Sequence, residues 1–106
     1  MDKAAVLKIV DRFHQGMAAR GIKPSKLILY GTHASDTARE DSDIDLVVIS
    51  NDFEDKDYWE RIDILADVIY DIFAPIEAVA FTQTEWEQGN SFVTDFARDG
   101  EILFAA

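Results

Sequence analysis

Three aspartates, Asp41, Asp43 and Asp45, stand directly in front of an apolar run over residues 46–49, and this combination constrains the fold more than any other feature of the chain. The apolar run indicates a buried strand. Because alternate side chains of a strand share a face, Asp43 and Asp45 are expected to project together, about 6.7 Å apart. The strand therefore begins at a charged rim and continues into the core.

Hydrophobic spacing predicts the remaining elements. We expect helices over residues 2–20 and 56–73, strands over 27–30, 43–49, 76–81 and 102–104, and a helix that starts at a capping box on Thr84 and continues through Phe96. This order predicts a single domain over residues 1–106 of the α/β (α+β) class. It should have a small mixed β-sheet, with the first two strands adjacent and the helices packed on one side.

Charge and composition exclude several function classes. The formal net charge of −11 argues against binding to long nucleic acids, which requires a face rich in lysine and arginine. A small anion could still bind locally beside a metal ion or backbone amides. No apolar stretch is long enough to span a membrane, and the N-terminal segment is too polar for a signal peptide. We therefore expect a cytoplasmic location by default, and the absence of cysteine is compatible with a reducing compartment.

Glu77 is a single carboxylate in an otherwise apolar strand. If that strand lies beside the strand of Asp45, Glu77 can turn toward the same rim as Asp43 and Asp45. Like charges held together are unfavourable unless a cation is present, and hard oxygen ligands suit Mg²⁺ or Mn²⁺. Two such ions are the usual arrangement for attack on phosphorus. Gly31 and Thr32 offer a turn and a hydroxyl that could hold phosphate.

The motif formed by these residues resembles that of a known superfamily. Ten positions after Thr32, the chain continues with Ser42-Asp43-Ile44-Asp45 and an apolar run. This spacing resembles the signature of the DNA polymerase β-like nucleotidyltransferases, and most of all their minimal nucleotidyltransferases. The resemblance runs nearly the whole length of the chain and implies the nucleotidyltransferase fold.

The resemblance also implies roles for individual residues. Gly31 and Thr32 would hold the triphosphate of an NTP, with ATP as the expected donor, and Ser42 and Arg39 are further candidates for nucleotide binding. Asp43, Asp45 and Glu77 would ligate the metals, and Glu77 would also serve as base for the acceptor hydroxyl. Thr32 replaces the usual serine and Glu77 the usual aspartate. His33 and Ser35 stand where arginines are frequent, and Asp36 where glycine is frequent.

Other interpretations of the same residues remain open. A calcium loop would require glycine after Asp45 and a glutamate at its twelfth position, where the chain has Leu46 and Asp52. Glycosyltransferases and phosphatases usually carry an Asp-x-Asp pair after the apolar strand and not before it. The aspartates could also be a solvated strand start, and Glu77 an ordinary edge-strand charge. His33 is interpreted as a loop histidine that could approach the phosphates.

Two function classes follow. In the first, the protein is an enzyme that transfers a nucleoside monophosphate to a hydroxyl, and a second subunit or protein substrate supplies the acceptor. In the second, it is an antitoxin-like module that binds a helical partner, which the resemblance implies to be of the HEPN type. A homo-oligomer is left open. Trp59, Tyr70 and Trp86 are interpreted as core or interface residues, and the acidic run over residues 52–63 as a solvated face or a dock for a basic partner.

Overall fold

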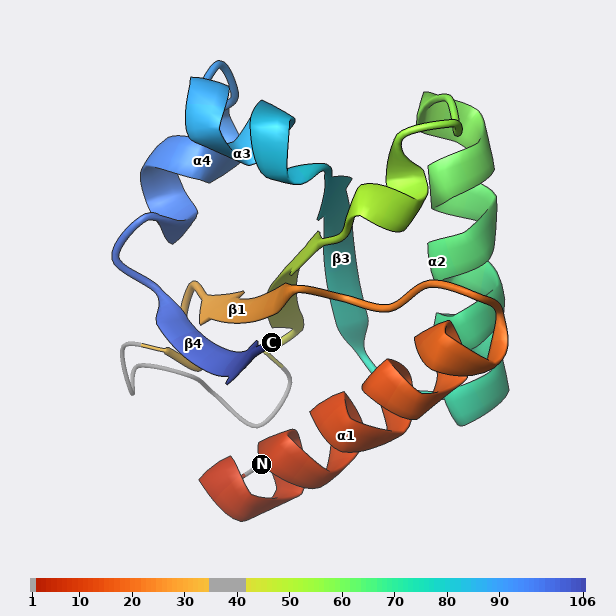
Figure 1. The fold of residues 1–106 in the computed structure, drawn as a ribbon. Coiled ribbons are helices and arrows are strands. Elements are labelled where there is room, and N and C mark those ends of the chain that lie inside the picture. Colours follow the sequence, from red (N-terminus) through yellow and green to blue (C-terminus); the bar gives the residue numbers. More distant parts are fainter. Residues whose placement is uncertain (1, 35–41) are drawn as a thin grey trace.

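The computed structural model describes residues 2–34 and 42–106, which form one four-stranded sheet with helices around it (Figure 1). In chain order the elements are α1 (Lys3–Ala19), β1 (Lys26–Tyr30), β2 (Ile44–Ile49), a 3-10 turn (Asn51–Phe53), α2 (Tyr58–Ile72), β3 (Ile76–Phe81), α3 (Gln83–Gln88), α4 (Phe92–Ala97) and β4 (Glu101–Ala105). The predicted α+β class is confirmed. Of the helices described, none is long and apolar enough to cross a membrane.

The sheet has the strand order β3-β2-β1-β4. β1 pairs antiparallel with both β2 and β4, whereas β2 pairs parallel with β3. The predicted mixed sheet and the adjacency of the first two strands are therefore confirmed. Because β2 and β3 run in the same direction and β1 in the opposite one, the starts of β2 and β3 lie beside the end of β1.

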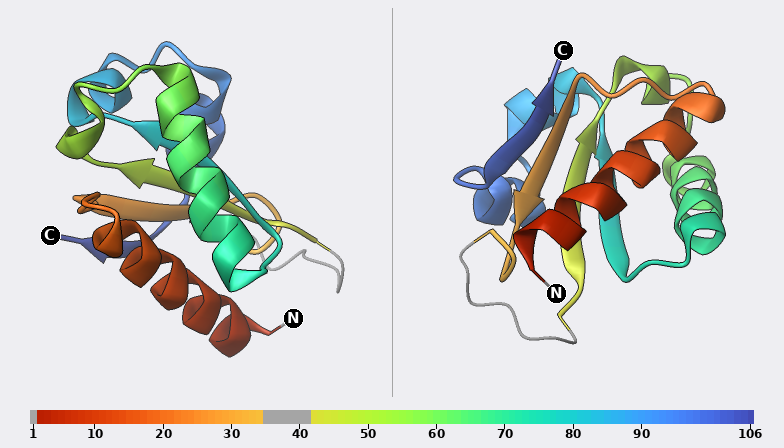
Figure 2. Two further views of the ribbon diagram at one scale, coloured as in Figure 1. Left: turned by 90° about the vertical axis from the view of Figure 1, so that its right-hand side faces the viewer. Right: turned by 90° about the horizontal axis from the view of Figure 1, so that it is seen from below.

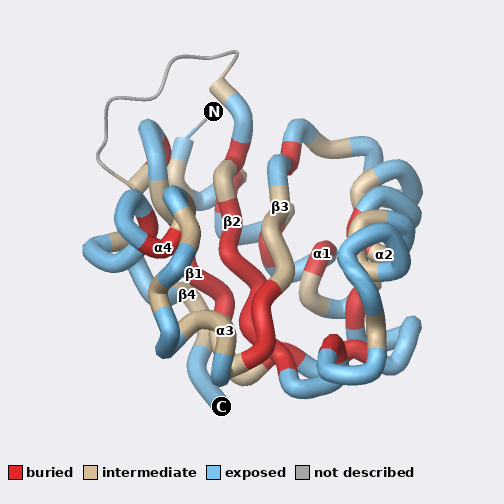
Figure 3. The backbone as a smooth tube through the Cα atoms, turned by 90° about the horizontal axis from the view of Figure 1, so that it is seen from above, coloured by how far each residue is buried: buried red, intermediate tan, exposed pale blue. Residues whose placement is uncertain are grey.

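Both faces of the sheet are covered. On one face, α1 and α2 bury the side chains that include Leu29, Leu46 and Val48 (Figure 2). On the other, the alternate residues Val47 and Ile49 form a second apolar cluster with residues of the α3 and α4 segments. Figure 3 shows the resulting buried centre along β1 and β2. The prediction that the helices pack on one side of the sheet holds for the two long helices, α1 and α2. The short helices α3 and α4 cover the second face, because the β2 side chains on that face are also apolar.

The predicted helix from Thr84 through Phe96 is two helices. α3 starts after Thr82, not Thr84, because the Thr82 hydroxyl accepts a hydrogen bond from the Glu85 amide and the Glu85 carboxylate accepts one from the Thr82 amide. α3 ends at Gly89, whose φ of 66° is the left-handed conformation that ends a helix. Ser91 then caps α4. The overlapping Thr-x-x-Glu patterns made the cap ambiguous in the sequence.

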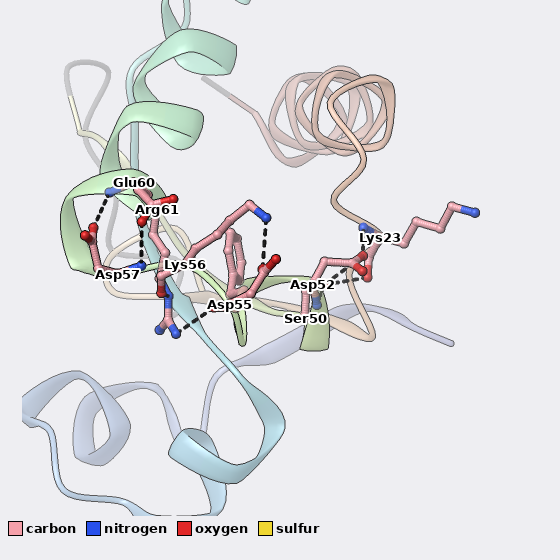
Figure 4. A network of polar contacts seen from close by, with 9 residues as sticks. Lys23, Ser50, Asp52, Asp55, Lys56, Asp57, Glu60 and Arg61 are labelled. Atoms are coloured by element: carbon pink, nitrogen blue, oxygen red, sulfur yellow. Dashed lines mark hydrogen bonds and ion pairs between the residues drawn. The ribbon is translucent and has the colours of Figure 1, made fainter.

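Arg61 joins the start of α2 to the preceding turn, as Figure 4 shows, and it also contacts α3. Its Nη1 donates to Glu85 Oε1 (2.6 Å), its Nη2 to the Phe53 carbonyl (2.8 Å) and its Nε to the Lys56 carbonyl (3.0 Å). Burial alone would raise the pKa of Glu85, but the Thr82 amide and Arg61 outweigh it and hold that pKa below its usual range. Arg61 therefore organises three segments.

Replacing Arg61 by lysine is expected to lower the free energy of unfolding by about 1–3 kcal/mol, because one ammonium group cannot reach all three acceptors. Urea unfolding at neutral pH measures the loss. Since the pKa of Glu85 is lowered in the folded state, its share of the stability should be present at neutral pH and disappear as the pH falls through that lowered value. Arg98→Lys, an exposed site on the C-cap of α4, is the control; an equal loss in both variants would contradict the assignment.

Candidate functional site

The candidate site lies where β1 ends and β2 and β3 begin. Asp45 on β2 is paired in register with Tyr30 on β1 and with Glu77 on β3, and Asp43 precedes β2 by one residue. The parallel pairing of β2 with β3 thus brings Glu77 beside Asp45, although 31 residues separate them in sequence. We call Asp43, Asp45 and Glu77 the carboxylate rim.

Exposure differs among the three acids. Asp45 is half-buried, whereas Asp43 and Glu77 are exposed. Burial raises the pKa of the Asp45 carboxyl, and the negative charges of Glu77 and Asp43 raise it further, as does a hydrogen bond with Glu77; His33 acts in the opposite direction. The three carboxylates therefore interact electrostatically, and Asp45 is at their centre.

Tyr30 is a neighbour of the rim that the sequence interpretation did not single out. It is half-buried directly opposite Asp45. Burial raises the pKa of its hydroxyl, and the charges of Asp45 and Glu77 add to the effect. The Tyr30 hydroxyl therefore stays neutral near pH 7 and can donate a hydrogen bond at the rim. The only sequence signal for this role was its position directly before Gly31.

Gly31 lies against the carboxylate of Asp45. Its φ is +72°, and a Cβ placed on it would lie 2.3 Å from Asp45 Oδ2. The left-handed backbone conformation therefore favours glycine, and a side chain at this position would force the turn or the Asp45 carboxylate to move. Gly31 and Thr32 are exposed, and Gly31 also lines a small hollow of about 200 Å³ together with Tyr30, Ala34, Phe96, Asp99 and Gly100. The turn thus presents its backbone beside both the rim and this hollow.

Ser42 is half-buried at the start of β2. Its carbonyl oxygen takes part in a hydrogen bond that links this segment to the turn at Gly31. The Nε2 of His33 lies 3.1 Å from the Ser42 carbonyl oxygen. Because a carbonyl can only accept, Nε2 carries the proton and donates. His33 lies in a turn, in agreement with the loop position that the sequence suggested, but it is only 5% exposed, so it is a buried positioning residue. Arg39, the remaining predicted nucleotide ligand, lies outside the described residues, as do Ser35 and Asp36.

Replacing His33 by alanine is expected to lower the free energy of unfolding by about 1–3 kcal/mol, because a buried hydrogen bond and packing volume are lost. We also expect weaker transfer activity, since the segment that carries Asp43 loses its anchor. Urea unfolding and the labelling assay described below measure the two effects. His14→Ala, which removes the other histidine from its contact with Phe104 on β4, is the control and should spare activity. Equal activity of the two variants would contradict the positioning role.

The chemistry of the rim fits a divalent cation. Carboxylate oxygens are the ligands that Mg²⁺ and Mn²⁺ prefer, and the mutual repulsion that raises the pKa of Asp45 is what such a cation would offset. Within residues 2–34 and 42–106, no group of three or more histidine, aspartate or glutamate side chains is arranged to hold a metal ion. A metal ion bound at the rim would therefore require its carboxylates to rearrange around the ion.

A larger hollow, of about 460 Å³, lies between α2, β3 and α3 and shares no residue with the rim. Its lining includes Arg61 and Glu85, which already pair with each other. These groups serve the fold, as described above. The candidate site therefore rests on the rim and the Gly31 turn.

Comparisons with known proteins identify the family and support the fold. A family model described as "Nucleotidyltransferase domain" matches residues 7–96. A solved structure of a Sulfolobus solfataricus protein, provisionally described as a nucleotidyltransferase, has 14% identity and a TM-score of 0.67, covering 96% of this chain and 87% of that one. A second, from a toxin–antitoxin structure with AMP-PNP, has 17% identity and a TM-score of 0.63, covering 91% and 73%. No sequence among the curated proteins matches the chain. At these identities, the structural likeness shows the fold.

Proposed function

Because the chain belongs to the nucleotidyltransferase domain family, we propose that it transfers a nucleoside monophosphate from an NTP to a hydroxyl acceptor. The observation that carries the proposal is the position of Asp45, which is in register with Glu77 on one side and lies against Gly31 on the other. Acidic side chains that could hold a metal ion therefore lie beside a glycine turn that could hold phosphate. ATP is the proposed donor, with support from the relative solved with AMP-PNP. We place the reaction in the cytoplasm, where NTPs are available.

Each residue has a role in this proposal. Asp43, Asp45 and Glu77 would hold Mg²⁺ or Mn²⁺, which would offset the negative charge of the triphosphate. The backbone at Gly31 and Thr32, with Ser42 and Arg39, would bind the phosphates. Tyr30 would donate a hydrogen bond at the rim.

The reaction itself requires one bond to form and one to break. The acceptor oxygen bonds to the α-phosphorus, the bond from that phosphorus to the bridging oxygen breaks, and pyrophosphate leaves. Glu77 is the proposed base that takes the proton of the acceptor hydroxyl, because it is exposed at the rim beside Asp45. Besides proton transfer to Glu77, alignment of the acceptor oxygen with the α-phosphorus and its leaving group at the rim contributes to the rate enhancement.

We further propose that the acceptor hydroxyl belongs to a protein partner, with a helical HEPN-type protein as the candidate. The solved relative from a toxin–antitoxin structure favours such a partner. In the alternative function, the protein binds that partner without transferring nucleotide. The two functions differ in whether the carboxylate rim is needed.

The test incubates the protein with α-phosphate-labelled ATP, Mg²⁺ and a HEPN-type candidate partner, and measures label that becomes covalently attached to protein. We expect label with the wild type and none with Asp43→Asn or Asp45→Asn. If both variants neutralise or modify the partner as the wild type does, the enzymatic proposal fails. If no NTP gives label while the partner still binds, the binding-only function is favoured.

A further inference from the structure

An exposed aromatic stripe runs along the outer side of α2. Trp59, Tyr70 and Phe73 are 70%, 81% and 92% exposed, and Ala66 between them is exposed as well. These four residues follow one another at intervals of seven, four and three positions, which places them on one side of a helix. Among the described residues, no helix or strand lies in front of α2 in the left view of Figure 2. We call Trp59, Ala66, Tyr70 and Phe73 the aromatic face.

The end of this face has an unfavourable conformation. Phe73 caps α2 with φ 51° and ψ 55°, a left-handed conformation that a bulky non-glycine residue adopts at a cost. Its ring is turned to solvent, so burial does not repay that cost. A shallow hollow of about 440 Å³ lies beside it, lined by Ile69, Tyr70, Phe73, Ala74 and Pro75. Strain together with an open apolar hollow is typical of a surface that binds a partner.

A row of acids flanks the aromatic face. Asp63, Asp67 and Asp71 follow one another at four-residue spacing and are exposed. Asp71 pairs with Arg20 of α1, whereas in the described part of the chain Asp63 and Asp67 have no ion-pair partner. The one basic residue of α2, Arg61, is turned inward to Glu85. The flank therefore carries uncompensated negative charge.

This negative charge favours some binding partners of the aromatic face over others. A second copy of the chain that used the same face would bring two rows of aspartates together, which is unfavourable. A partner with lysine or arginine beside an apolar stripe would instead gain from both features. α2 has 15 residues and is therefore about 22 Å long, which matches about two heptads of a partner helix.

We propose that the aromatic face of α2 docks a helix of a second protein, with apolar residues at heptad spacing and lysine or arginine along one flank. This interaction goes beyond the proposed nucleotidyl transfer and does not require it. Phe73 and Pro75 lead directly into β3, where Glu77 belongs to the carboxylate rim. Glu77 is four positions after Phe73 in the chain, although the rim shares the sheet face of Val47 and Ile49 and α2 covers the opposite face.

The test measures fluorescence anisotropy of two fluorescein-labelled helical peptides, each about three heptads long. Both carry leucine at the first and fourth heptad positions; one carries lysine at the flanking positions and the other glutamate. Nucleotide is omitted, and Asp45→Asn is measured beside the wild type, so that loss of catalysis and loss of docking are separate results. We expect the lysine peptide to bind both proteins and the glutamate peptide to bind at least about tenfold more weakly.

Substitutions locate the binding. Trp59→Ser and Phe73→Ser should each weaken binding of the lysine peptide about tenfold or more, as expected for central aromatic residues. Phe92→Ser on α4, where the ring is 82% exposed, is the matched control and should leave binding unchanged. The double variant Asp63→Lys/Asp67→Lys, which changes surface charge alone, should prefer the glutamate peptide.

Several results would overturn the proposal. These are binding of neither peptide, equal binding of both, an unchanged preference in the double lysine variant, or an equal loss in Phe92→Ser. Sedimentation of the wild type as a dimer that Trp59→Ser dissociates would assign the face to a second copy instead. Circular dichroism melts establish whether each variant is folded. If a serine variant unfolds, the peptide preference of Asp63→Lys/Asp67→Lys still tests the proposal.

Discussion

Replacing Asp45 by asparagine is expected to abolish nucleotidyl transfer and, at the same time, to raise the thermal midpoint of the metal-free protein at neutral pH. Transfer should fall by at least about 100-fold, because the central ligand of the rim is lost. The stability gain has a separate cause. Asp45 is half-buried between Glu77 and Asp43, and removing its charge relieves both the repulsion and the cost of burying it.

The pH dependence of this gain has a defined sign. The folded-state pKa of Asp45 lies above the ordinary value of 3.8, so the folded protein binds more protons than the unfolded chain between those two pKa values. The wild type therefore loses stability as the pH rises through this window, and Asp45→Asn lacks that loss. The difference in midpoint should be greatest above the window and should vanish below pH 3.8.

Thermal melts in EDTA across this pH range measure the difference in thermal midpoint. The control variant is Asp67→Asn, which changes an exposed residue of α2. Excess Mg²⁺ should then raise the midpoint of the wild type and not that of Asp45→Asn, because a ligand that binds only the folded state stabilises it. A destabilised Asp45→Asn would show that this carboxylate has partners that hold it in the fold. An equal response of both proteins to Mg²⁺ would contradict a metal site at the rim.

Replacing Gly31 by alanine is expected to damage both the fold and the site. The left-handed backbone costs alanine about 1–2 kcal/mol relative to glycine. In addition, the new methyl group would lie 2.3 Å from Asp45 Oδ2, so either the turn or the carboxylate must move. We therefore expect a larger loss of unfolding free energy than the backbone term alone, together with loss of transfer activity.

Gly21→Ala provides the matched control for this variant. Gly21 has a similar positive φ of +82°, but a Cβ there would have no atom within 4 Å. Gly21→Ala should therefore lose only the unfolding free energy that the left-handed backbone costs, which urea unfolding measures. It should keep full activity in the labelling assay. Equal losses in the two variants would show that the contact between Gly31 and Asp45 has no consequence for the site.

Local patterns in the sequence were sufficient for most of the elements and for the strand that carries Asp45. The apolar run after Asp45 predicted a buried strand, and the alternation of side chains in a strand placed Val47 and Ile49 on a different face from Leu46, as the two apolar clusters of the structure confirm. The spacing of Gly31-Thr32 from Asp43 indicated the family, which the match over residues 7–96 shows. These features depend on neighbouring residues, so the sequence carries them directly.

Tertiary structure decided what depends on residues far apart in the chain. The parallel register of β2 with β3 places Glu77 beside Asp45, and it arises from hydrogen bonds between strands that a long helix separates. His33 is buried because Ser42 folds back against it, and the aromatic side chains of Trp59 and Tyr70 are exposed because α1 and the sheet pack on the opposite side of α2. Helical spacing predicts that such residues share a side of the helix, but only the packing of the whole chain determines which side faces water.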